Sequence, residues 1–156
     1  MAFDAFIKFG DIPGESTDNL HKDWIEVISF SWGVSNTSTG GAGGGGVGKS
    51  SIHDFSVVKY IDKASPALFE QCCSGDHIQE AAFELTNQKD QSFYKLRFTD
   101  VLISSVSPNG STAGRAPMEQ LSFTFAQVDI SAADPKGQFG PPVICGAPAG
   151  TVAHHH

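Results

Sequence analysis

The sequence predicts a mainly β fold: a single-domain antiparallel β-barrel of two packed sheets with one short α-helix. Three observations support this. The length of 156 residues suits one domain, and a hydrophobic content of 40% suffices for a packed core. Most apolar segments alternate with period two, as half-buried strands do. Only one stretch combines helical spacing with residues that start and stop helices.

The first half of the chain contains three predicted strand regions. Residues 3–9 alternate, so Phe3, Ala5, Ile7 and Phe9 are expected to share the inward face. Residues 24–33 are apolar or small on both faces, and residues 55–61 alternate again.

The second half contains three more predicted strands, at residues 78–86, 92–106 and 119–130. In the last of these the apolar phase moves by one residue between Phe125 and Val128. A β-bulge would produce such a shift, so we expect one there.

The helix is expected to follow residue 64. Ser65 is a good N-cap, Pro66 suits the first helical turn and Gly75 suits the residue after the last turn. The helical spacing predicts one core-facing stripe made of Leu68, Phe69, Cys72 and Cys73.

The charge composition argues against two classes of partner. The formal net charge is -7, and charged residues make up 17% of the chain, against about 25% in average domains. Without a basic face, neither nucleic acid nor an anionic membrane surface is expected as a partner, and no apolar run is long enough for membrane insertion. The N-terminus lacks the pattern of a Sec-type signal peptide, so we expect folding in the cytoplasm. The three cysteines imply no disulfide framework.

One motif resembles that of an enzyme. Gly43–Ser50 satisfies the nucleotide-binding P-loop pattern G-x-x-x-x-G-K-[ST], which makes a nucleotide-binding protein an alternative reading. A P-loop, however, follows a buried strand and opens a helix. Here a polar stretch precedes the motif, and residues 51–58 alternate like a strand. The context therefore argues against phosphate binding.

No other group of residues predicts chemistry. Ser51, His53 and Asp54 suggest a hydrolase, but neighbouring strand residues point to opposite faces. The spacing of Cys72, Cys73 and His77 fits no common zinc site. We expect no catalytic, cofactor-binding or metal-binding residues, and hence no enzyme. Low charge is typical of surface that becomes protein interface, so a chain that binds copies of itself or other proteins is favoured.

Several segments together resemble the haemolysin-coregulated protein (Hcp) family of bacterial type VI secretion systems. They are Phe6–Ser16 (FIKFGDIPGES), Ile28–Ser35, Lys59–Pro66, Cys73–Gly75, Ser104–Ser107 and Glu119–Val128. The resemblance covers about residues 1–130. It implies a β-barrel domain at residues 1–131 with a glycine-rich loop at 35–50. Residues 132–153 are expected to form an irregular tail, and His154–His156 look like a tag remnant.

The resemblance also implies a function. Hcp proteins are structural tail-tube subunits that form homohexameric rings, and these rings stack into a secreted hollow tube. The implied partners are further copies of the chain and the sheath, spike (VgrG-type) and effector proteins, with export that uses no signal peptide. A phage-type tail tube protein is a neighbouring alternative. Hcp-like loops suggest an oligomer or stacking interface at Gly40, Gly41, Gly43, Gly44, Gly45, Gly46, Val47, Gly48 and Lys49.

Overall fold

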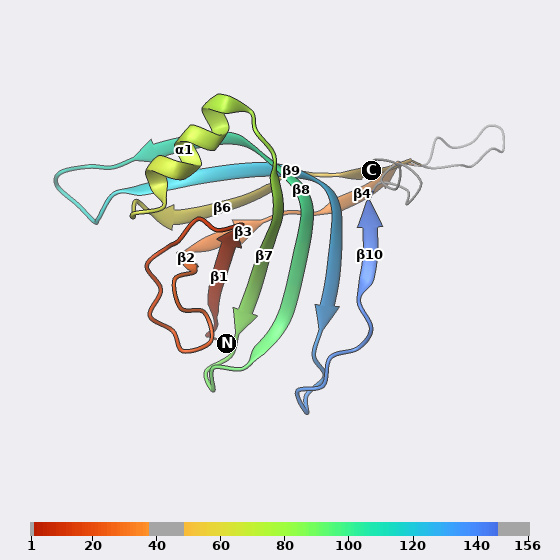
Figure 1. The fold of residues 1–156 in the computed structure, drawn as a ribbon. Helices are drawn as coiled ribbons and strands as arrows, with labels where there is room; N and C mark the ends of the chain where they lie inside the picture. The colour runs from red at the N-terminus through yellow and green to blue at the C-terminus, as the bar shows by residue number, and fades with distance from the viewer. Residues whose placement is uncertain (1, 38–48, 147–156) are drawn as a thin grey trace.

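The computed structural model describes residues 2–37 and 49–146, and it confirms the mainly β barrel with one helix (Figure 1). The elements in chain order are β1 (Asp4–Phe9), β2 (Ile25–Val27), β3 (Ser29–Ser31), β4 (Val34–Thr37), β5 (Lys49–Ile52), β6 (Phe55–Tyr60), α1 (Ser65–Ser74), β7 (Ile78–Thr86), β8 (Ser92–Asn109), β9 (Met118–Ala132) and β10 (Val143–Gly146).

One antiparallel sheet curls almost into a closed barrel. Its strand order is β2-β1-β7-β8-β9-β6-β3, with β10 added beside β9. The two ends of this order are consecutive in the chain: β2 pairs with β1, and β3, two residues later, pairs with β6. Between them, the amide of Ile28 donates a hydrogen bond of 2.7 Å to the carbonyl of Val58. A single extended segment therefore fastens both edges of the sheet.

The two layers expected from the sequence are parts of this one sheet, which bends along a row of three residues. In β7 the buried face changes phase between Ile78 and Ala81, across Gln79. In β8 it changes across Asp100, which has a left-handed φ of 60°, and in β9 across Ala126. Past this row β8 and β9 curve from the part of the sheet with β1 into the part with β6 (Figure 1). Strands that bend in this way form the corners of orthogonal sheet packings.

The bend corrects the expected β-bulge in the last strand. The phase change between Phe125 and Val128 is real, but the pairing of β8 with β9 keeps its register there, with Val101 opposite Phe125 and Thr99 opposite Gln127. One residue on each strand lies between these pairs, so no residue is inserted. The register shifts instead between Ile103 and Ser105 of β8.

Aromatic rings fill the barrel. Phe55 of β6 lies at the centre, fully buried, with its ring centroid 5.1–5.3 Å from those of Phe83, Phe98 and Phe123. The expected inward face is buried at Ala5, Ile7 and Phe9, but Phe3 is 49% exposed. Phe3 precedes β1, and its ring lies edge-on to the Phe30 ring with 6.4 Å between the centroids.

Helix α1 corrects two details of the sequence prediction. Ala64, not Ser65, is the N-cap residue, and Ser65 begins the first turn. Only Leu68 of the expected stripe is buried; Cys72 is half-buried, whereas Phe69 and Cys73 are exposed. Gly75 ends the helix with a left-handed φ of 73°, as its position predicts. At ten residues, α1 is neither long nor apolar enough to cross a membrane.

The chain after residue 131 is not wholly irregular, contrary to expectation. A turn at Asp134–Gln138 leads back to β10, which pairs with Gln127–Ile130 of β9. Pairing is possible because Gly146 lies against the bend: a Cβ on this residue would come within 2.3 Å of the Ala126 carbonyl oxygen. The Pro- and Gly-rich composition obscured this short strand in the sequence.

Burial raises the pKa of the Tyr94 phenol above its ordinary value, and a hydrogen bond with Trp32 opposes the rise only in part. The unfolded chain ionises Tyr94 near pH 10, before the folded chain does. We therefore expect this tyrosine to reduce stability as pH rises past about 10. Ultraviolet titration of the protein and of Tyr94→Phe measures the folded signal, and guanidinium gives the unfolded one. Ionisation of Tyr94 at the same pH in both states would contradict the expectation.

Candidate self-association edges and the helix clamp

The structure tests the predicted interface loop only at its end. Gly40, Gly41, Gly43–Gly46, Val47 and Gly48 lie outside the described residues. The backbone of Lys49 begins β5, where it pairs with Thr37 of β4. What the structure does describe is the base from which this loop departs.

That base is a separate two-stranded ribbon formed by β4 and β5. It continues the β3–β6 pairing beyond Trp32, and the amide of His53 donates a 2.9 Å hydrogen bond to the Gly33 carbonyl at the junction. The ribbon projects from the side of the barrel (Figure 1). Val34 on β4 is 55% exposed. Among the described residues, both outer edges of the ribbon lack a strand partner.

The second open edge belongs to β10. Within residues 2–37 and 49–146 this strand pairs only with β9. Cys145 packs against the core, but Val143 and Ile144 are 65% and 61% exposed. Apolar side chains therefore emerge from both faces of an unprotected sheet edge.

The ribbon also bears on the P-loop alternative. A P-loop needs a helix that starts at its Lys-Ser end. Here Lys49–Ile52 are a strand, paired residue by residue with β4. The structural context of a phosphate-binding loop is absent at this end of the motif.

Two of the residues that suggested a hydrolase, His53 and Asp54, bond to other residues and not to each other. The His53 ring shares a 3.2 Å hydrogen bond with the Ser35 hydroxyl, whereas the Asp54 carboxylate accepts one from Ser104. His53 and Asp54 lie between β5 and β6 rather than on the continuous strand expected from the sequence, and their side chains bond to different partners. His77 bonds to Asp100 through Nδ1 at 2.6 Å. No described group of three or more His, Cys, Asp or Glu side chains is arranged to hold a metal ion.

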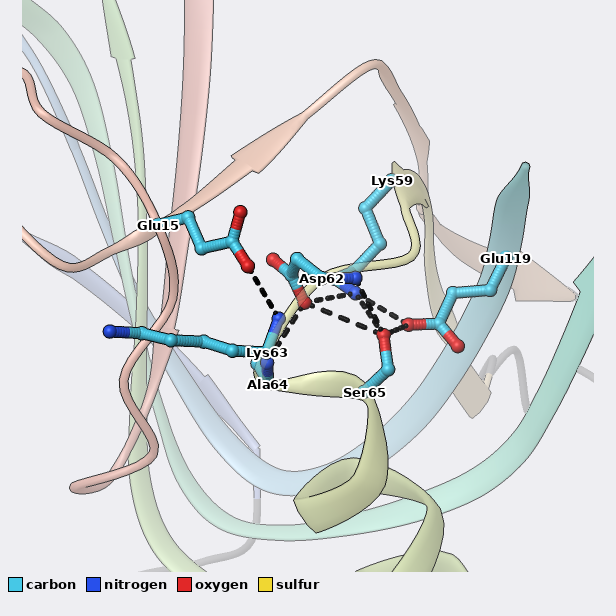
Figure 2. A network of polar contacts seen from close by, with 7 residues as sticks. All are labelled: Glu15, Lys59, Asp62, Lys63, Ala64, Ser65 and Glu119. Atoms are coloured by element: carbon cyan, nitrogen blue, oxygen red, sulfur yellow. Dashed lines mark hydrogen bonds and ion pairs between the residues drawn. The ribbon is translucent and has the colours of Figure 1, made fainter. Parts of the chain in front are cut away.

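A buried polar cluster, the helix clamp, joins α1 to the barrel. It consists of Lys59, Asp62, Ser65 and Glu119, and sequence reasoning missed it (Figure 2). Lys59 is fully buried and pairs in register with Glu119, which is 3% exposed. Its ammonium donates to the Glu119 carboxylate, to Asp62 at 2.9 Å and to Ser65 at 3.1 Å. Asp62 also accepts the Ala64 amide at the helix start.

The clamp extends to the loop before β2. The Glu15 carboxylate accepts the Lys63 amide at 2.7 Å (Figure 2). The sequence does hold a signal for the clamp: strict alternation places Lys59 on the inward face with Phe55 and Val57. A charge at an inward position indicates a buried partner.

His21 forms a second missed cluster. It is 1% exposed, and its ring stacks on Phe6 at 4.4 Å. Its two nitrogens face the carboxylates of Asp18 at 2.8 Å and Glu84 at 2.7 Å. Both contacts are complete only when both nitrogens carry protons. The cluster fixes the loop before β2 to β7.

A surface cavity of about 660 Å³ lies between the end of β1 and the start of β7. Its lining charges include Arg97 and Glu80, which form an exposed ion pair at 3.2 Å. This lining mixes both signs of charge and includes His77, whose Nδ1 bonds to Asp100.

Three comparisons with known proteins point to the same family. Residues 6–131 match the family model described as "Type VI secretion system effector, Hcp". The chain is 40% identical to protein hcp1 of Pseudomonas aeruginosa over 134 residues, which cover 83% of each chain. The crystal structure of Hcp1 from Salmonella typhimurium has a TM-score of 0.81 at 36% identity, over 94% of this chain and 95% of that one. For a type VI secretion system effector from Yersinia pestis the values are 0.79 and 32%, over 92% and 100%. The chain therefore belongs to the Hcp family of type VI secretion system proteins.

Proposed function

We propose that this Hcp protein is a structural subunit that forms homohexameric rings, and that these rings stack into a hollow tube. The observation that supports this most directly is that, within residues 2–37 and 49–146, sheet edges stay unpaired at two places, the β4–β5 ribbon and β10. Two different sheet edges on one subunit permit a heterologous contact, which closes into a ring when its rotation allows.

The proposed role needs no chemistry from the chain itself. The subunit would act as a component and carrier, with the sheath, spike and effector proteins of the secretion system as partners. It would be assembled inside the cell and then exported with the tube. The family match supports this role over a phage-type tail tube, and the strand at Lys49–Ile52 argues against a nucleotide-binding one.

The glycine-rich loop, with Gly40, Gly41, Gly43–Gly46, Val47, Gly48 and Lys49, is proposed as the contact to an adjacent subunit or ring. Glycine allows close approach to another backbone. The β4–β5 ribbon, whose two strands flank this segment in the chain, projects from the side of the barrel (Figure 1), which supports a contact outside the subunit's own core.

Deleting residues 40–48 is expected to weaken assembly and to leave the barrel intact, because the core cluster of the described residues is built mainly from strands of the large sheet. Light scattering should report hexamers for the intact protein and smaller species for the variant, and electron microscopy should show rings and stacked rings only for the former. Circular dichroism checks that both chains fold. Unchanged ring formation and stacking in the variant would remove the loop from the proposal, and a strictly monomeric intact protein would remove the ring.

A further inference from the structure

We infer that the open edge of β10 on one copy pairs with the open edge of β4 on the next, so that these two strands form the seam of the proposed ring. This inference rests on the proposed self-assembly and names the segments that carry it. The occupant of each edge is a second copy of the same chain.

Natural proteins keep solvent-exposed edges apart with charged side chains, proline, bulges or very short strands. Of these features the two edges have only the last, since each strand is four residues long. β10 reads Val-Ile-Cys-Gly and β4 reads Val-Ser-Asn-Thr, with no charge and no proline in either. Pairing of the two strands therefore meets no electrostatic repulsion. Edges without charge or proline are expected where a partner covers them.

Exposed apolar groups accompany both edges. Val143 and Ile144 on β10 and Val34 on β4 are each more than half exposed. Covering apolar surface supplies the driving force that backbone hydrogen bonds alone lack in water. An isolated two-stranded ribbon is marginally stable by itself, so the β4–β5 ribbon also gains from a third strand.

The two edges cannot satisfy each other within the described chain. β4 belongs to the two-stranded ribbon and β10 to the large sheet, and no pairing joins them. Among the described residues, each copy thus offers the β4 edge and the β10 edge as two different unpaired edges, besides the outer edge of β5. Pairing the first edge of one copy with the second edge of another leaves the same two edges free at the ends of the pair. This is the geometry that continues until a ring closes.

Cysteine cross-linking tests the seam. In a background with Cys72→Ser, Cys73→Ser and Cys145→Ala, Ile144→Cys is combined with Val34→Cys or with Asn36→Cys. Val34 and Asn36 are alternate positions on one face of β4, so the two combinations sample two registers. The matched control combines Ile144→Cys with Phe69→Cys, on an exposed face of α1.

After mild oxidation, we expect a non-reducing gel to show a ladder of linked copies up to the hexamer for one of the β4 combinations, and none for the Phe69 control. Rings seen by electron microscopy without such a ladder would overturn the seam and leave the proposed function standing. Absence of rings in the intact protein overturns both.

A charge on the open edge gives a second, independent readout. Because the Ile144 side chain is 61% exposed, Ile144→Lys should leave the fold intact. It places a charge where strands would meet, and we expect rings to require roughly tenfold more protein, the equivalent of about 1.4 kcal/mol. Phe69→Lys is the matched control. Equal assembly of the two variants would count against the seam.

Discussion

Lys59→Met is expected to destabilise the fold by about 3–5 kcal/mol, because it leaves the buried Glu119 carboxylate without its cation. Methionine keeps most of the side-chain volume, so the change isolates the charge from the packing. For a chain of this size such a loss lowers Tm by roughly 6–20 °C. Thermal unfolding followed by circular dichroism measures it.

Two further variants separate the clamp from general effects of removing a lysine. Lys63→Ala removes a lysine next in the same turn, and only the backbone amide of this residue joins the clamp network. We expect little change there, since exposed charges contribute little. Adding Glu119→Leu to Lys59→Met should recover much of the loss, because an apolar pair replaces the unpaired carboxylate. The same Tm for Lys59→Met and Lys63→Ala would contradict the assigned role of the clamp.

Phe55→Ala is expected to cost about 3–5 kcal/mol, the range for deleting a buried phenylalanine ring. Phe55 packs against Phe30, Trp32, Phe83, Phe98 and Phe123, which come from both parts of the bent sheet. The cavity cannot easily collapse, because paired strands hold its walls in register. Urea unfolding should show a lower midpoint with a similar slope.

Phe69→Ala is the matched control for this prediction. It removes the same atoms from a side chain that is 57% exposed, so most of the hydrophobic loss is absent. We expect an effect several times smaller. A midpoint shift for Phe55→Ala no larger than that for Phe69→Ala would show that the central ring does not carry the core.

Local sequence patterns predicted the strands well where one face of the strand is buried and the other is exposed to solvent. The expected strand at residues 78–86 coincides with β7, and those at 92–106 and 119–130 lie within β8 and β9. Alternation is a property of neighbours along the chain, so it can be read without knowing the partner strand. Gly75 was predictable for the same reason, because a left-handed helix end is a local requirement.

What the sequence did not reveal depends on residues far apart. Lys59 is buried because Glu119 lies opposite it on another strand, and His21 because Glu84 reaches it from β7. The phase change near Phe125 suggested a bulge, since one strand alone cannot show that its neighbours change phase in the same row. Phe69 was predicted to face inward because the helical stripe is wider than the contact that α1 makes with the barrel.

At the candidate interface, too, local patterns were visible in the sequence and contacts between distant residues were not. The glycine-rich segment was visible as composition, but its assignment to Gly40–Lys49 stays a prediction. The β10 edge could not be predicted, because a four-residue strand between proline-rich and glycine-rich stretches gives too short a pattern. Its pairing with β9 is settled by tertiary contact rather than by local preference.

The pairing of early strands with late ones, β1 with β7 and β6 with β9, has a consequence for the time course of folding. In the β1–β7 pair, Asp4 lies opposite Thr86, and in the β6–β9 pair Phe55 lies opposite Phe123, so neither pair can form until the later strand has been made. Partners so distant in sequence make closure slow, whereas β7, β8 and β9 can pair as consecutive hairpins. On the ribosome the apolar β1 therefore emerges long before the strand that covers it. The order of synthesis runs against the order of pairing, and we expect the edge of β1 that β7 covers to stay exposed on the nascent chain until β7 has been made.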